Sequence, residues 1–427
     1  MNKVVLAYSG GLDTSVAVAW LKEQFGVEVV TLTVDLGGGS LREGVEARAI
    51  SSGASRAYVV DARERFVTDF VWPHLQANAL YQGAYPLATA LARPLIAQLL
   101  VEVAGKEGAD AVAHGCTGKG NDQVRFDIAT HALNPGLEVV APMRVGMGLT
   151  RDEEIDYAAE RGIEIPITKA SPYSIDVNLW GRSCETGVLE DPWVTPPADA
   201  YEWTVAPADA PSPVEVTIAF EGGIPVAIDG ERLGPVVLVE RLHQLGSAHG
   251  VGRIDHVEDR LVGIKSREIY EAPAAVMLHT AHRALESLTL TRDTLRFNRF
   301  VADELSRLIY DGLWFSALSR DLRAYAASSQ RVVSGDVRLR LDRGQAAVVG
   351  RRSPLSLYDK SLATYDEGDA FDHAAAVGFI EIFGLPLRVE AARHGAVGKF
   401  HGAAWTWTDP LLEHLPTDVT DPEPAAV

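Results

Sequence analysis

The sequence holds few of the residues that build disulfide frameworks, zinc sites or nucleic-acid surfaces. Only two of its 427 residues are cysteine, Cys116 and Cys184, which is too few for a disulfide framework or a cysteine-rich zinc site. Basic residues are also fewer than acidic ones: the chain has 39 Lys and Arg and 58 Asp and Glu, which gives a formal net charge of −19. Phosphate backbones need basic surfaces, so we expect no nucleic-acid partner.

Two further absences concern membrane spans and common nucleotide motifs. The most apolar helical segment, 87–104, contains Arg93, Pro94 and Glu102, so we expect a core helix and no membrane partner. The amino terminus leads straight into an apolar strand without a cleavage site, which favours a cytoplasmic location. Neither a Gly-Lys-Ser/Thr loop nor a Gly-x-Gly-x-x-Gly fingerprint occurs.

The most informative segment that is present reads VVLAYSGGLDTS at residues 4–15. An apolar run long enough for a buried strand turns at Ser9-Gly10-Gly11 and enters a helix. Two glycines let the backbone approach a bulky anion, and the N–H groups and the dipole of the helix then face that anion. The pattern resembles the pyrophosphate-binding loop of ATP pyrophosphatases. An ordinary glycine-rich turn is the alternative.

Apolar runs and helical patterns alternate through the first third of the chain. Such alternation indicates an α/β fold with a parallel, doubly wound sheet, whose ligands lie beyond the carboxyl ends of the strands. We expect strands at 4–8, 28–34, 56–60, 110–113 and 137–141, and helices at 14–25, 42–51, 73–78, 87–105 and 122–131.

The character of the sequence changes after Ile165-Pro166. Hairpin patterns at 214–229 and 331–351 and two helices beyond Ala272-Pro273 predict an α+β domain. The apolar segment 374–387 then precedes a loose tail. We therefore expect three parts: 1–167, 168–370 and 371–427.

Three polar segments outside the first loop are candidates for chemistry. The run HGCTGKGNDQVRF at 114–126 places three glycines and many polar groups at a strand end, although Asn121 or Asp122 alone is equally explained as a helix cap. Residues 171–185 are typical of a loop folded over a small polar ligand, or of a solvated surface loop. Residues 249–270 form a charged strand–turn region, which taken alone indicates a solvated sheet face.

A metal cage and a reactive thiol are the weaker interpretations. His279 and His282 lie three residues apart, but no cysteine or ordered carboxylate set accompanies them. Cys116 has Lys119 as a neighbour, yet a free cysteine is more often a small packed residue. We expect no metal ligands from this chain.

Taken together, these segments resemble the argininosuccinate synthases, in the same order and over nearly the whole chain. The resemblance weakens after about Leu387, and the tail with Trp405-Thr406-Trp407 matches nothing in that pattern. The matching stretches are AYSGGLDTS, YPLATALARP, HGCTGKGNDQVRF, SPYSIDVNLWGRSCETGVLEDPW, HGVGRIDHVEDRLVGIKSREIYEAP and SPLSLYDKSLATYD.

The resemblance implies ATP-dependent ligation of citrulline and aspartate to argininosuccinate, with AMP and pyrophosphate released. It implies an ATP-pyrophosphatase-type domain at 1–167, a synthetase domain at 168–370 and an oligomerisation segment at 371–427 of a homotetramer. Positions that match ATP contacts are Ala7, Tyr8, Ser9, Gly10, Gly11, Leu12, Asp13, Thr14, Ser15, Val34 and Gly115. Positions that match aspartate contacts are Thr117, Asn121 and Asp122. Positions that match citrulline contacts are Tyr85, Asn121, Arg125, Ser174, Ser183, Glu258 and Tyr270.

The chemistry of a ureido group suggests a route through an adenylate. The ureido oxygen is a poor leaving group, so we hypothesise that it attacks the α-phosphate and forms a citrullyl-adenylate, from which the aspartate amine displaces AMP. Asp13 and Asp122 are the catalytic candidates, and Asp122 is expected to hold the substrate ammonium. Mg²⁺ is expected to share the phosphate charge. Ala90 stands where some family members carry a serine near citrulline, so that hydroxyl contact is expected to be either absent or replaced by water.

Three other functions are compatible with parts of the pattern. Enzymes that adenylate tRNA bases share the loop, but they need reactive cysteines and a basic RNA-binding surface. A GMP-synthetase-like enzyme would depend on ammonia or glutamine instead of aspartate. A regulatory nucleotide-binding module is disfavoured because Asp13, Asn121, Asp122 and Arg125 are all retained.

Overall fold

The computed structural model describes residues 1–41, 43–163, 173–365 and 369–394. The expected boundary at 167/168 and the tail beyond 394 lie outside the described residues. The described chain divides into two units, one at 1–358 and one that begins at Asp359. The first unit carries all the predicted site residues.

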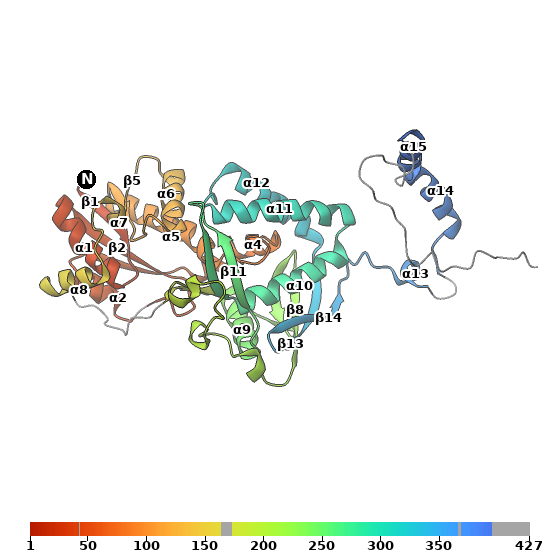
Figure 1. Ribbon diagram of the computed structural model, residues 1–427, viewed down its shortest axis with the longest axis horizontal. Coiled ribbons are helices and arrows are strands. Elements are labelled where there is room, and N and C mark those ends of the chain that lie inside the picture. The colour runs from red at the N-terminus through yellow and green to blue at the C-terminus, as the bar shows by residue number, and fades with distance from the viewer. Residues whose placement is uncertain (42, 164–172, 366–368, 395–427) are drawn as a thin grey trace, which may run out of the picture. The chain divides into compact units, whose positions relative to one another are not determined.

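The amino-terminal part of the first unit is built on a parallel five-stranded sheet in the order β3-β2-β1-β4-β5, of which β1, β2 and β5 are labelled in Figure 1. Its strands are close to the predicted ones: β1 (Lys3–Ala7), β2 (Glu28–Asp35), β3 (Arg56–Asp61), β4 (Ala111–Ala113) and β5 (Glu138–Val140). The helices around it are α1 (Leu12–Phe25), α2 (Val45–Ser51), α5 (Ala88–Glu107), α6 (Asn121–Leu133), α7 (Pro142–Val145) and α8 (Arg151–Glu160).

Both faces of this sheet are covered, which explains the continuous apolar runs of its strands. Val4 and Leu6 of β1 pack into the hydrophobic core that contains the α1 residues, whereas Val5 packs into the core that contains the α5 residues. Helix α5 is long and apolar enough to cross a membrane, but 61% of its apolar window is buried inside the fold. Its packing is that of the core helix predicted from sequence.

The rest of the first unit contains two antiparallel sheets, in the orders β10-β9-β8-β13-β14 and β11-β12-β7-β6. The first sheet comprises β8 (Val214–Glu221), β9 (Ile224–Ile228), β10 (Glu231–Arg232), β13 (Gly335–Asp342) and β14 (Gln345–Arg352). The second comprises β6 (Ser174–Asn178), β7 (Gly181–Glu185), β11 (Arg253–Asp259) and β12 (Lys265–Glu271). The predicted loop at 171–185 is therefore wrong in its described part, which forms the β6–β7 hairpin.

Helices connect and cover these sheets. The helical region before α5, missed in part by the sequence analysis, comprises α3 (Arg63–Phe66), the π-helical turn η1 (Val67–Val71) and α4 (Trp72–Gln76). Beyond β10 come α9 (Pro235–Ala248), α10 (Pro273–Thr289), α11 (Arg292–Tyr310) and α12 (Ala317–Ser329). Short 3-10 turns are η2 (Gly187–Glu190), η3 (Ala198–Ala200), η4 (Pro207–Asp209) and η5 (Gln330–Val332). The second unit contains α13 (Lys360–Ala363), α14 (His373–Phe383) and α15 (Leu385–His394).

A glycine-rich loop after β2 packs against the β6–β7 hairpin. Leu179 N–H donates to the Leu36 carbonyl at 2.9 Å. A Cβ on Gly38 would lie 2.6 Å from the Asn178 carbonyl oxygen, and φ of Gly38 is +69°. Only glycine permits this close approach. The contact fixes the hairpin beside the carboxyl ends of the parallel strands.

Candidate active site

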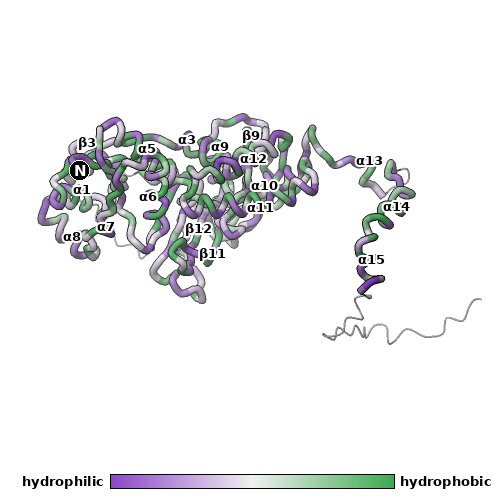
Figure 2. The backbone as a smooth tube through the Cα atoms, turned by 90° about the horizontal axis from the view of Figure 1, so that it is seen from above, coloured by the Kyte–Doolittle hydropathy of each residue, from purple (hydrophilic) through white to green (hydrophobic). Residues whose placement is uncertain are grey.

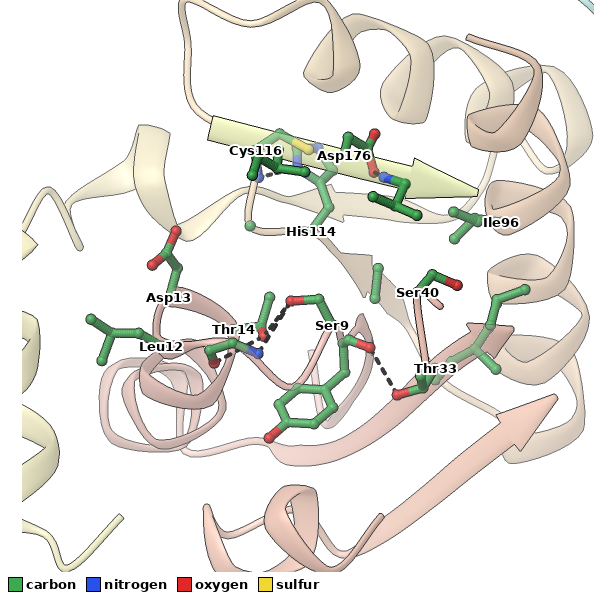
Figure 3. Close-up of a pocket in the computed structure, with 18 of the residues that line it drawn as sticks. Ser9, Leu12, Asp13, Thr14, Thr33, Ser40, Ile96, His114, Cys116 and Asp176 are labelled. Carbon is green, nitrogen blue, oxygen red and sulfur yellow. Dashed lines mark hydrogen bonds between the residues drawn. The ribbon is translucent and has the colours of Figure 1, made fainter. Parts of the chain in front are cut away.

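The turn between β1 and α1 presents backbone N–H groups to a cavity. Gly10 has φ of +72°, a left-handed conformation that favours glycine. Gly11 caps α1 without any side-chain hydrogen bond to the helix. Ser9 Oγ lies 3.2 Å from Thr14 Oγ1 and accepts from Gly11 N–H at 3.3 Å (Figure 3). The turn therefore combines uncapped N–H groups, two hydroxyls and the positive end of a helix dipole.

Buried contacts behind the turn hold it in place. The Tyr8 hydroxyl lies 2.8 Å from Ser15 Oγ, and both residues are buried. Thr33 Oγ1 on β2 donates to the Tyr8 carbonyl at 2.8 Å. Arg48 Nη1 on α2 donates to the Gly10 carbonyl at 3.3 Å. The loop is thus fixed by its own helix, by β2 and by α2 before any ligand binds.

A cavity of about 990 Å³ opens above this turn. It is lined by the loop, β2, α5, α8, the segment after β4 and strand β6. All the predicted ATP positions line it except Gly10 and Ser15, and these two belong to the same turn. Val34 on β2 and Gly115 after β4 line the cavity as well. Its volume is at the upper end of the range of roughly 300–1,000 Å³ for small-molecule sites.

The wall opposite the loop carries His114 and Cys116, which Figure 3 shows across the cavity from Ser9 and Thr14. Cys116 N–H donates to His114 Nδ1 at 3.2 Å, and His114 Nε2 lies 2.9 Å from Asp127 Oδ1. Burial, and to a smaller extent Asp122, raises the pKa of the Cys116 thiol. This cysteine is therefore a neutral thiol and not an activated nucleophile at neutral pH.

Asp122 forms the centre of an ion-pair network at the edge of the cavity. Its Oδ2 accepts from Arg93 Nη2 at 2.8 Å, and its Oδ1 accepts from Arg125 Nη1 at 2.9 Å. Burial raises the pKa of Asp122, but the two guanidinium groups more than offset it, so the pKa lies below its ordinary value. Asp122 is consequently ionised at neutral pH. Arg93 Nη2 also bonds Asp176, which comes from β6.

Four of the predicted citrulline residues lie in one buried cluster beside this network. Tyr85 and Tyr270 stack with ring centroids 4.1 Å apart, and Tyr270 donates to Glu258 Oε2 at 2.6 Å. Arg125 joins the cluster from α6. The four residues of this tyrosine–glutamate cluster are each less than 5% exposed: Tyr85, Arg125, Glu258 and Tyr270.

Tyr310 connects this cluster and was missed by the sequence analysis. Its hydroxyl donates to Glu258 Oε1 at 2.5 Å and accepts from Asn121 Nδ2 at 2.8 Å. Arg125 Nε donates to the Tyr310 carbonyl at 2.9 Å, and its guanidinium lies 4.8 Å from the centre of the Tyr310 ring. One residue at the end of α11 therefore contacts three predicted substrate positions. These partners lie far away in sequence, so no local pattern reveals them.

The remaining predicted positions lie around the cluster and not within it. Ser183 is opposite Tyr270 in the β12–β7 register and opposite Asp176 in the β6–β7 register. Thr117 and Ser174 are exposed, Thr117 just before α6 and Ser174 at the start of β6. Ala90 is fully buried on α5. Asp13 is exposed in the first turn of α1 and lines the cavity.

Comparison with known proteins covers almost the entire described chain. Residues 3–164 match the arginosuccinate synthase N-terminal HUP domain, and residues 173–390 match the arginosuccinate synthase C-terminal domain. The chain is 57% identical over 393 residues to the argininosuccinate synthase of Symbiobacterium thermophilum, covering 92% of this chain and 98% of that protein. The chain belongs to the argininosuccinate synthase family.

Two other argininosuccinate synthases are similarly close. That of a Synechococcus species is 58% identical over 399 residues, covering 93% of this chain and 99% of its own. That of Dehalococcoides mccartyi is 54% identical over 391 residues, covering 91% and 96%. As an argininosuccinate synthase, the protein is an ATP-utilising ligase that joins citrulline and aspartate in arginine biosynthesis. This excludes the tRNA-adenylating, GMP-synthetase-like and non-catalytic alternatives.

The cavity above the β1–α1 turn and the buried tyrosine–glutamate cluster lie side by side. The ion-pair network of Arg93, Asp122 and Asp176 separates the cavity above the β1–α1 turn from the tyrosine–glutamate cluster. Arg93 and Asp176 belong to the cavity wall, while Asp122 shares Arg125 with the cluster. The two regions therefore meet at a charged boundary.

Proposed function

We propose that this synthase works through a citrullyl-adenylate. The ureido oxygen of citrulline attacks the α-phosphorus of ATP, pyrophosphate leaves, and the amine of aspartate then displaces AMP from the activated carbon. The observation that carries this proposal is the shared boundary between the cavity and the tyrosine–glutamate cluster. Arg93 and Asp122 lie at this boundary. A triphosphate in the cavity would place its α-phosphorus there, next to the ureido group of a citrulline bound at the cluster.

The β1–α1 turn would stabilise the departing pyrophosphate. Its N–H groups and the hydroxyls of Ser9 and Thr14 are fixed before the reaction, so no reorganisation is needed as charge develops. Such preorganised donors each contribute about 3–4 kcal/mol to transition-state stabilisation in well-studied cases. The predicted ATP contacts remain our proposal, with Val34 near the adenine and Gly115 on the opposite wall.

Asp122 would hold the aspartate ammonium, with Thr117 and Asn121 beside it. Its lowered pKa keeps a carboxylate available for that cation, although Arg93 and Arg125 already share its oxygens. In the site that aspartate would enter, the two arginine charges are balanced by the carboxylates of Asp122 and Asp176. Arg125, Glu258 and the two stacked tyrosines would bind the amino-acid end of citrulline, with Ser174 and Ser183 along the β6–β7 hairpin.

Mg²⁺ fits as an ion that arrives with the nucleotide. Among the described residues, no group of three histidine, cysteine, aspartate or glutamate side chains could form a dedicated cage. Mg²⁺ usually keeps its waters and takes only one or two carboxylates besides phosphate oxygens. Asp13, the catalytic candidate exposed at the cavity beside the turn, would lie near the phosphates and is not assigned as a dedicated ligand. The ion would neutralise phosphate charge when bound.

A coupled assay tests the proposed route. Pyrophosphate should be released from ATP only when citrulline is present, and argininosuccinate should form only when aspartate is added. Oxygen-18 in the ureido group of citrulline should appear in AMP, because that oxygen becomes bonded to the α-phosphorus. AMP without the label would rule out the adenylate.

Replacing Tyr310 by phenylalanine is expected to raise the KM for citrulline about tenfold or more, because a hydrogen bond to a charged group is worth about 1.5–3 kcal/mol. The lost hydroxyl orients both Glu258 and Asn121. The KM for ATP should stay near the wild-type value. Tyr325→Phe, which removes a hydroxyl bonded to Asn298 on α11, is the matched control. An unchanged citrulline KM in Tyr310→Phe would contradict the positioning role.

We further propose three parts of the chain: a nucleotide domain at 1–167, a synthetase domain at 168–370 and an oligomerisation segment at 371–427. The described part of this last segment would mediate assembly into a homotetramer. In the second unit, α14 is largely hydrophobic (Figure 2). Its Ile380, Ile382 and Phe383 side chains are between 66% and 76% exposed within the single chain. Exposed apolar surface of this kind is typical of an interface. Light scattering of the full chain should give a tetramer, and a monomer at micromolar concentration would contradict the proposed assembly.

We also propose a cytoplasmic location for the enzyme.

A further inference from the structure

Arg93 holds a singular position in the cavity wall. It lies on α5 and is the only lysine or arginine among the described residues that line the cavity. A triphosphate carries several negative charges, so the one cationic side chain that faces it should interact with it strongly. The proposed ATP contacts otherwise consist of backbone N–H groups and hydroxyls, with Asp13 as their only charged member.

The bonding of the Arg93 guanidinium leaves donors free. Both carboxylate partners, Asp122 and Asp176, bond the same nitrogen, Nη2. Nε has no hydrogen-bond partner among the described residues, but it is buried within the protein and not open to the cavity. The other terminal nitrogen, Nη1, forms no hydrogen bond to a described residue either, and it is not fully buried. Because native proteins rarely leave such donors without a partner, Nη1 points to an acceptor that is supplied by a ligand.

The partners of Arg93 also place it between the proposed substrate sites. Asp122 belongs to the proposed aspartate site and is bonded to Arg125 of the proposed citrulline site. Asp176 comes from β6, where it pairs in register with Ser183. The guanidinium thus lies between the nucleotide cavity and both amino-acid positions. The α-phosphorus must occupy this boundary if it is to meet the ureido oxygen.

We propose that Arg93 is a catalytic residue that donates hydrogen bonds to a non-bridging oxygen of the α-phosphoryl group during its transfer to citrulline. This inference rests on the adenylate route proposed above. In the step, a lone pair of the ureido oxygen forms the bond to phosphorus. The bond from the α-phosphorus to the bridging oxygen breaks, and its electron pair leaves with pyrophosphate. The ureido carbon takes up the positive charge, and no proton moves.

The test compares Arg93→Lys and Arg93→Gln with the wild type in citrulline-dependent exchange of labelled pyrophosphate into ATP, without aspartate. Loss of one preorganised donor typically costs about 10²–10³ in rate, and we expect a fall of that size for Arg93→Gln. The decisive readout uses the two diastereomers of ATP that carry sulfur on the α-phosphorus. Sulfur at the oxygen contacted by Arg93 should make the wild type prefer one diastereomer, and both variants should reduce that preference at least tenfold.

The controls separate the outcomes. Arg65→Gln makes the same change on an arginine that pairs with Glu102 of α5 outside the cavity, and it should keep both the rate and the preference. Wild-type enzyme without citrulline-dependent exchange would overturn the adenylate route itself. Exchange in the wild type with the same diastereomer preference in Arg93→Lys would overturn the role of Arg93 alone. Arg93→Lys keeps the positive charge for Asp122 and Asp176, so it supplies this answer even if Arg93→Gln fails to fold.

Discussion

Asp122→Asn is expected to lower argininosuccinate formation by about 10³-fold, within the range for loss of a group that handles a proton. The substitution keeps the shape of the side chain but removes the charge that the substrate ammonium requires. Asp122 is ionised because Arg93 and Arg125 hold its pKa below the ordinary value against the effect of burial. The neutral amide cannot replace that carboxylate, either as a counter-ion or as a proton acceptor.

The two halves of the reaction should respond differently to this change. Citrulline-dependent pyrophosphate exchange does not require aspartate, so we expect it to fall far less than the complete ligation. Steady-state rates at varied aspartate and the exchange rate, measured on the same preparation, make the comparison. Asp61→Asn alters another aspartate–arginine pair, with Arg63, outside the cavity and serves as the matched control. Near-normal synthesis at low aspartate in Asp122→Asn would remove Asp122 from the mechanism.

The sequence predicted the nucleotide half of the fold well because its signals are local. Buried parallel strands need continuous apolar runs, and the positive φ of Gly10 requires glycine at the turn. The strands and the turn therefore follow from neighbouring residues. The cavity above them follows from the parallel sheet, whose loops gather at one edge. The family resemblance then supplied the residue assignments, which no single pattern in the chain provides.

The amino-acid half was less predictable because its contacts are distant in sequence. The sequence of the β6–β7 hairpin is typical of a loop, because polar residues such as Asp176 interrupt the apolar pattern of its strands. Asp176 bonds Arg93, which precedes it by 83 residues. Tyr310 bonds Asn121, which lies 189 residues away. Polar side chains that satisfy one another across elements leave no periodic signal. Only the folded chain shows that Tyr310 and Arg93 contact the predicted substrate positions.

Acidification below pH 6.5 should destabilise the enzyme through histidines buried away from the site. His74 on α4 and His279 on α10 are almost fully buried, with ring centroids 5.0 Å apart and Trp180 beside both. Burial lowers the pKa of His74 to about 3. Burial, and the charge that His74 would carry, also lower the pKa of His279. Both rings are consequently neutral in the folded protein at neutral pH.

The sign of the effect follows from proton binding. Between pH 6.5 and about 3 the unfolded chain protonates His74 while the folded chain does not, so the free energy of unfolding falls as the pH falls. Well below pH 6.5 the slope approaches about 1.4 kcal/mol per pH unit for each such histidine, or about 2.8 kcal/mol per pH unit for the pair. Between pH 7.5 and 5.5 each histidine lowers the free energy of unfolding by about 1.4 kcal/mol in total, and urea unfolding over that range measures it. His74→Phe should reduce the slope by the share of one histidine, while the same change at exposed His131 on α6 should not. An equal slope in wild type and His74→Phe would contradict the neutral state of this buried ring.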